Sequence, residues 1–143
     1  MRSRVVWTFA RLQAAMVFLQ AVLAGGFLSG DSDLRQVHLA NAGLLWQVSL
    51  ALAVAAIVAW RRRRSPGWVA AAAGGLWVAI EVQMVTGVYG HLWLHIPLGV
   101  AIFGTTVAIV IGTRMGRGSR RPVGPSLPAP PAPIAGREGG TVA

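Results

Sequence analysis

Two glutamine–histidine pairs are the residues of this sequence whose types and spacing could do chemistry. Gln20 is followed eighteen residues later by His38, and Gln83 is followed twelve residues later by His95. Each of the four has a small residue four positions further along the chain, namely Ala24, Ala42, Gly87 and Gly99. Neutral imidazole is a common metal ligand, and two imidazoles on facing helices of a bundle can hold one metal from both sides.

Four apolar stretches are long enough to hold these residues inside a membrane. The chain of 143 residues is 55% hydrophobic and 12% charged, which is too apolar for an ordinary soluble domain. A membrane-spanning helix needs roughly 20 mostly apolar residues, and the stretches that qualify are residues 5–28, 37–60, 68–89 and 92–113. We therefore expect an all-α fold: an integral membrane four-helix bundle, up-down-up-down, built from two pseudo-repeated hairpins.

The end of the chain has a different composition. Residues 116–143 are rich in proline, glycine and alanine and include the segment Pro-Ala-Pro-Pro-Ala-Pro, which cannot bury a core. The sequence predicts a four-helix domain over residues 1–115, followed by a disordered cytoplasmic tail. The chain has no cysteine, so thiolate metal sites and disulfides are excluded and any cofactor must use other ligands.

The basic residues predict the orientation in the membrane. All thirteen are arginine, and all except Arg35 precede or open the first span, lie at residues 61–64 or follow the fourth span. The positive-inside rule places these regions, and so both termini, on the cytoplasmic side of the cell membrane. Such clustering also argues against nucleic-acid binding as the reason for the net charge of +9. Arg2 and Arg4 before an apolar run that ends in Ala-Gly-Gly leave a cleaved signal peptide as an alternative.

This topology places the two histidines on the same, outer side, about one helical turn inside the membrane. Ala42 and Gly99 share a helix face with them and leave a slot that a flat macrocycle could occupy. The cofactor expected is haem b with His38 and His95 as axial ligands, and with Arg35 beside a propionate. Zinc fits less well because its third ligand would have to be His91.

A structural alternative applies to the same residues. Histidines near a membrane surface often cap a helix or bond to backbone and headgroups, and glutamines and small residues often only pack helices together. Glu81, which is the acidic residue inside a span, is expected to make an interhelical hydrogen bond or to serve proton movement. It lies two residues from Gln83, so the two side chains should point toward different helices.

Residues 12–113 resemble one four-helix half of the haem A synthase family. The matching pieces are Leu-Gln-Ala-Val-Leu-Ala-Gly-Gly with His38, and Val-Gln-Met-Val-Thr-Gly with Trp-Leu-His-Ile-Pro-Leu-Gly around His95. A group of small uncharacterised bacterial membrane proteins looks similar. The resemblance implies a haem-binding fold with these histidines as ligands. The family's Glu before the helix-two histidine and Arg after it are replaced by Arg35 and Leu39, so the synthase reaction itself is not implied.

The function expected is electron transfer or haem handling at the outer side of the membrane. One haem near one face cannot carry an electron across roughly 30 Å of hydrocarbon, so a quinone or a membrane redox partner would be needed. An alternative of another class is a cofactor-free accessory or assembly subunit of a larger membrane complex. A small transporter that works as a homo-oligomer is a third.

The arginine clusters predict the result of a topology experiment. Reporters fused after Arg64 or within the C-terminal tail should behave as cytoplasmic, and one placed near Asp31 should behave as external. Paired phosphatase and fluorescent-protein fusions make this measurement. A cytoplasmic signal at Asp31 would reverse the orientation and the side assigned to the histidines.

Overall fold

Four helices make up the structured part of the protein. The computed structural model describes residues 3–115, and the predicted tail of residues 116–143 lies outside them. The helices are α1 (Arg4–Leu28), α2 (Asp33–Arg61), α3 (Gly67–Val88) and α4 (Leu92–Met115). Each is long and apolar enough to cross a membrane. The expected all-α fold is confirmed, and the chain is a multi-pass membrane protein.

Helix α2 begins at Asp33, earlier than the apolar stretch expected to start at residue 37. Hydropathy marks the residues that favour lipid, whereas the helix itself continues into a polar extension. Asp31 Oδ1 accepts the backbone N–H of Asp33 at 3.1 Å, and the charge of Asp33 suits the positive end of the helix dipole. The turn before it is therefore short, and Gly30 within it has a φ of 112°, which glycine adopts without strain.

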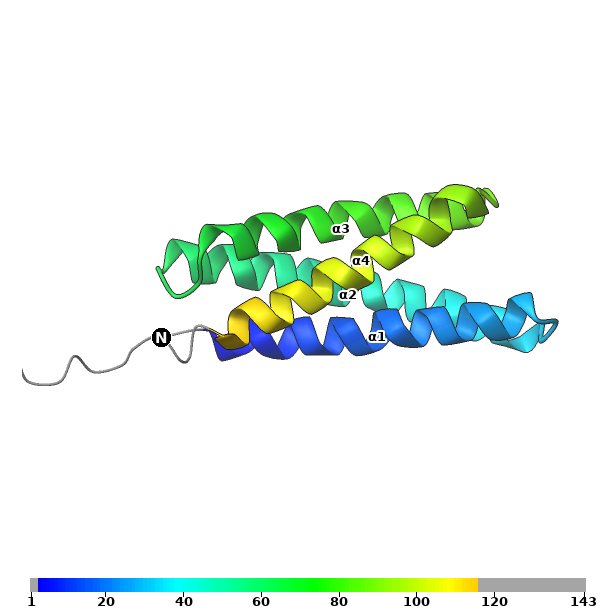
Figure 1. The fold of residues 1–143 in the computed structure, drawn as a ribbon, viewed down its shortest axis with the longest axis horizontal. Coiled ribbons are helices and arrows are strands. Elements are labelled where there is room, and N and C mark those ends of the chain that lie inside the picture. Colours follow the sequence, from blue (N-terminus) through cyan, green and yellow to red (C-terminus); the bar gives the residue numbers. More distant parts are fainter. Residues whose placement is uncertain (1–2, 116–143) are drawn as a thin grey trace, which may run out of the picture.

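The helices run alternately up and down, and each packs against two neighbours (Figure 1). Helix α1 contacts α2 and α4, and α3 also contacts α2 and α4. The helices that carry the two histidines, α2 and α4, therefore lie diagonally across the bundle from each other. Helix α1 buries Val6, Ala10 and Gln13, so it is an integral part of the bundle.

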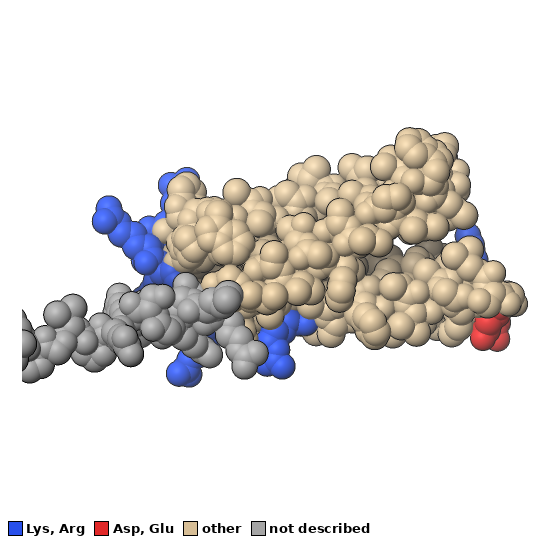
Figure 2. All heavy atoms as spheres, viewed as in Figure 1, with Lys and Arg blue, Asp and Glu red and all other residues tan. Residues whose placement is uncertain are grey.

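The two ends of the bundle differ in charge. We call the end with the Arg61–Arg64 turn the arginine end, and the opposite end, where both hairpins turn, the histidine end. Figure 2 shows most of the basic side chains toward the arginine end, and the acidic side chains together with a smaller basic area at the histidine end. Asp31 and Asp33 lie in and just after the α1–α2 turn.

The apolar core stops short of the histidine end. Its buried cluster reaches in that direction only as far as Val17, Leu45, Ile80 and Ile102. Beyond these, the buried side chains of residues 3–113 are Leu23, Asn41 and Thr86. Helix α4 diverges from α1 toward this end (Figure 1), and a recess separates the two hairpins there (Figure 2). The histidine end is therefore organised around polar side chains and an opening.

The packing predicts how two leucines of α2 differ. Leu52 is completely buried, whereas Leu50 is 37% exposed on the outer face of the helix. Leu52→Ala leaves a cavity and should lower the free energy of unfolding by about 2–5 kcal/mol, while Leu50→Ala should change it by about 0.5 kcal/mol or less. Reversible unfolding in detergent micelles measures both. Equal losses would contradict this assignment of the buried face.

Candidate functional site

The same pair of reciprocal hydrogen bonds closes each hairpin near the histidine end. In the first hairpin, Gln20 Nε2 donates to the His38 carbonyl at 3.0 Å, and His38 Nδ1 lies 3.2 Å from the Gln20 carbonyl. In the second, Gln83 Nε2 donates to the His95 carbonyl at 2.8 Å, and His95 Nδ1 lies 2.9 Å from the Gln83 carbonyl. Both glutamines therefore bond across a helix interface, as the structural alternative for them requires. We call these the first and second Gln–His pairs.

The hydrogen bonds determine which ring nitrogen carries the hydrogen. A carbonyl oxygen can only accept, so Nδ1 of each histidine must be the donor. In a neutral imidazole this leaves Nε2 with its lone pair, free to act as a base or a metal ligand. Metal-binding histidines are commonly oriented in this way, with the second ring nitrogen donating to a carbonyl or carboxylate. Each ring therefore makes at Nδ1 the kind of hydrogen bond that ligating histidines commonly make.

The small residues after each pair allow the helices to approach. The side chain four residues further along a helix lies next to the carbonyl that the partner must reach. A Cβ on Gly87 would lie 2.8 Å from His95 Cε1, and a Cβ on Gly99 would lie 3.1 Å from Gln83 Nε2. Gly99 thus makes room for the Gln83 amide on the side that faces α3. The first hairpin has alanine at the corresponding positions, Ala24 and Ala42.

The two pairs are completed differently. In the first hairpin, Asn41 Nδ2 donates to Gln20 Oε1. Leu98 takes the corresponding position in the second hairpin, three residues after His95. Gln83 Oε1 is consequently buried with no hydrogen-bond partner in the described part of the chain. The second pair therefore has an acceptor that a donor from outside the chain could satisfy.

The surroundings of the two rings also differ. Thr86 Oγ1 donates to the Gln83 carbonyl at 3.0 Å and lies 3.4 Å from His95 Nδ1. The ring of Phe27 stands edge-on to His38, with ring centroids 5.4 Å apart and planes at 65°. A polar contact therefore holds the His95 ring, and an aromatic contact holds the His38 ring.

The histidines of the two pairs lie on diagonal helices. Both are half-buried, one on α2 and the other on α4. His91 is exposed and stacks on Tyr89, with ring centroids 6.4 Å apart. Arg35 is exposed one turn before His38. Residues 3–115 contain no group of three or more His, Cys, Asp or Glu that could hold a metal ion, so a metal would rely on the two histidines.

Glu81 belongs to a different contact from Gln83, as its position on the helix predicts. Its Oε1 accepts a hydrogen bond from Trp46 Nε1 on α2, whereas Gln83 bonds to α4. The ring of Trp77 on α3 lies against Trp46, with centroids 6.4 Å apart. The interhelical hydrogen bond expected of Glu81 is therefore confirmed.

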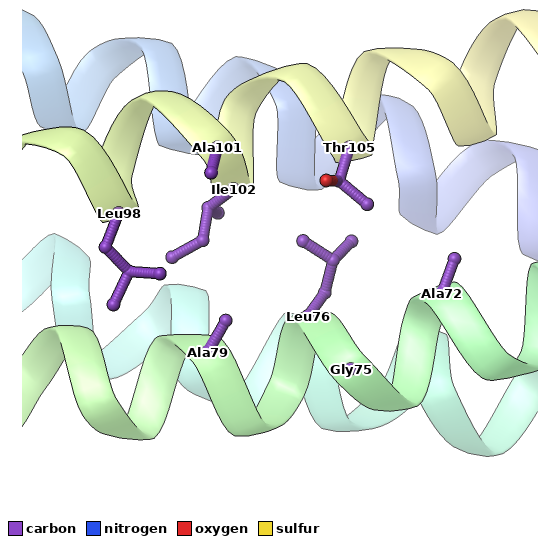
Figure 3. Close-up of a pocket in the computed structure, with 8 residues that line it drawn as sticks. All are labelled: Ala72, Gly75, Leu76, Ala79, Leu98, Ala101, Ile102 and Thr105. Carbon is purple, nitrogen blue, oxygen red and sulfur yellow. The ribbon is translucent and has the colours of Figure 1, made fainter.

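A separate cavity of about 260 Å³ lies between α3 and α4 (Figure 3). It is lined by apolar side chains and one hydroxyl, from Ala72, Gly75, Leu76, Ala79, Leu98, Ala101, Ile102 and Thr105. Gly75, Ala101 and Thr105 are exposed, so the cavity opens to the outer surface of these helices. It contains no titratable group and no metal ligand, so it is not the candidate cofactor site.

Three contributors to the site were not expected from the sequence. Asn41 completes the first pair, Thr86 contacts the Gln83 carbonyl and the His95 ring in the second, and Trp46 is the partner of Glu81. Asn41 could have been recognised from the sequence, because an amide inside an apolar span needs a partner and Asn41 lies one turn after His38. Thr86 and Trp46 could not have been recognised in this way, since threonine and tryptophan are ordinary residues in membrane helices.

Comparison of the chain with family models, curated proteins and solved structures gives no match in any of the three. The class of protein is therefore defined by the fold and the site alone. It is an integral membrane four-helix bundle in which a Gln–His pair closes each hairpin.

The site predicts a specific tautomer and a glycine on which it depends. Nitrogen NMR of histidine-labelled protein should show hydrogen on Nδ1 and none on Nε2 for His38 and His95. Gly87→Ala should displace the His95 ring and change the signals of that ring alone. Gly25→Ala, where a Cβ meets nothing within 4 Å, is the matched control. Nε2–H signals for both rings in the wild-type protein would contradict the assignment.

Proposed function

We propose that this chain is a small haem-binding membrane protein, with one b-type haem held between His38 and His95. The observation that carries the proposal is the repetition of the Gln–His pair. It orients two imidazoles on diagonal helices, each with Nε2 available. Two such nitrogens on opposite sides of a bundle form the donor set of a bis-histidine haem.

The packing supports the same proposal. The apolar core ends below the level of the pairs, and the hairpins separate at the histidine end (Figure 2). A flat, largely apolar group would cover apolar surface that the helices leave uncovered there. The ring of Phe27 beside His38 is an apolar wall of the kind that packs against a macrocycle.

Other residues would have supporting roles. Arg35, exposed one turn before His38, would pair with a propionate at the surface. Ala42 would leave room for the macrocycle edge, whereas the space beside Gly99 is taken by the Gln83 amide. Gln20 and Gln83 would orient the ligands through their carbonyls and amides.

The location proposed is the cytoplasmic membrane, with both termini in the cytoplasm and the histidine end on the outer side. Haem there supplies one-electron chemistry, and the protein provides ligands, orientation and a low dielectric. Because one haem lies near one face, a quinone or a membrane redox partner would carry the electron further. The role proposed is therefore electron transfer or haem handling.

A cofactor-free accessory subunit is the second candidate. The observation that favours it is that each Gln–His pair also joins two helices through satisfied hydrogen bonds, a usual way of holding membrane helices together. The exposed apolar residues at the α3–α4 turn, Val88, Tyr89 and Trp93, would then pack against a larger complex. The two candidates differ in whether the purified protein absorbs visible light.

Absorption spectra of the protein made with ample haem test the proposal. The wild type should show a Soret band and the sharp reduced bands of a low-spin haem. His38→Ala and His95→Ala should each lose haem or give a high-spin spectrum, and His91→Ala is the matched control that should change neither. Ala42→Leu should lower the occupancy.

Two results would count against haem and in favour of the accessory-subunit candidate. One is a wild-type protein that purifies folded but without a Soret band. The other is a wild-type spectrum retained in both single variants of the proposed ligands.

A further inference from the structure

The contact between Glu81 and Trp46 is the polar feature of the membrane interior that the Gln–His pairs do not use. Glu81 is half-buried on α3, and its Oε1 accepts the indole N–H of Trp46 from α2. One turn before it on α3, Trp77 has a buried indole nitrogen with no partner among residues 3–115. A carboxyl group inside a membrane is costly and is a functional candidate by default.

The pseudo-repeat shows which residues take the corresponding positions at the other helix interface. Glu81 stands two residues before Gln83, and Phe18 stands two residues before Gln20. Similarly, Trp46 and Phe103 each stand eight residues after the histidine of their helix. The equivalent of the Glu81–Trp46 contact is therefore the Phe18–Phe103 contact, where two rings meet with centroids 6.4 Å apart.

The same position in the fold is thus filled by an aromatic pair at one helix interface and by an acid with an indole donor at the other. Two aromatic rings pack two helices in a membrane without any desolvation cost. The acid brings that cost, which the hydrogen bond from Trp46 offsets only in part, so its presence makes it a candidate for a chemical role.

Glu81 lies close along the helix axis to the second Gln–His pair. Two residues correspond to an axial rise of about 3 Å, and Gln83 bonds directly to the His95 backbone. In an interior of low dielectric, a unit change of charge at the histidines acts on a nearby carboxylate more strongly than it would in water.

We propose that Glu81 is a redox-linked proton acceptor, which takes up a proton when an electron enters the haem. This inference rests on the function proposed above. The electron comes from an external one-electron donor and reduces Fe(III) to Fe(II). The proton comes from water and converts the Glu81 carboxylate to the carboxylic acid, so the net charge of the interior is unchanged.

Few other groups near Glu81 could take this role. The titratable or charged side chains described on the helices that pack against α3 are Asp33, Arg35 and His38 toward one end of α2, Arg61 at its other end, and His95 on α4. The two histidines are the proposed ligands, and Asp33, Arg35 and Arg61 are exposed near helix ends. Trp46, which bonds to Glu81, does not titrate.

Potentiometric titration of the haem-loaded full chain at several pH values tests the inference. In the wild type the midpoint potential should fall as pH rises, toward the limit of a tenfold change in the reduction equilibrium per pH unit, about 59 mV for one electron. Glu81→Gln, which keeps an acceptor for Trp46, should flatten this slope. Phe18→Leu, at the corresponding place in the first hairpin, is the control that should retain it.

A double variant controls for the possibility that Glu81→Gln loses the pH dependence because it misfolds. Glu81→Phe combined with Trp46→Phe copies the aromatic contact already present between α1 and α4, and it should fold, bind haem and lose the slope. Redox-difference infrared spectra add an independent readout, because the C=O band of a carboxylic acid should appear on reduction in the wild type alone.

The outcomes separate this inference from the function on which it rests. A haem-loaded Glu81→Gln protein with the wild-type slope and the wild-type infrared band overturns the inference and leaves haem binding intact. A folded wild-type protein without a Soret band overturns both.

Discussion

The reciprocal hydrogen bond between a glutamine and a histidine is the interaction on which the histidine end of this protein depends. Lipid offers no partners to buried polar groups, so each amide and imidazole must find one inside the bundle. Each Gln–His pair provides acceptors for the amide N–H and the imidazole N–H by using two helix carbonyls. Carbonyls are reachable only past small side chains, which accounts for Gly87 and Gly99. The tautomer of the two imidazoles follows from the same bonds.

Both hairpins contain a Gln–His pair, and they differ in the side chains that surround it. Asn41 completes the first pair, whereas Leu98 leaves the second with an unpaired acceptor. The Phe18–Phe103 contact is purely aromatic, whereas its counterpart is Glu81 with Trp46. The first hairpin is thus the more completely satisfied half, and the second carries the groups that remain available for chemistry. Membrane proteins commonly form their binding sites from repeated helical units of this kind.

The spans, the pseudo-repeat and the separation of Glu81 from Gln83 could be predicted, because hydropathy and helical periodicity are properties of a single segment. The start of α2 could not, since Asp33 extends the helix beyond its apolar part. Trp46 as the partner of Glu81 depends on how two helices are rotated against each other, which spacing along one helix does not encode. Gly99 was expected to border a macrocycle, and its contact with Gln83 emerges only when α3 and α4 are placed together.

The most direct measurement of the central claim is electron–nuclear double resonance on the ferric protein, expressed with ample haem and labelled with ¹⁵N in its histidines. If the two Gln–His pairs present their Nε2 atoms to one iron, the spectrum should show strong coupling to two imidazole nitrogens in a low-spin centre. Mutation of either His38 or His95 should leave coupling to one imidazole nitrogen or, where haem is lost, no ferric signal. Coupling to a single nitrogen in the wild-type protein, or the absence of any ferric signal, would contradict the account.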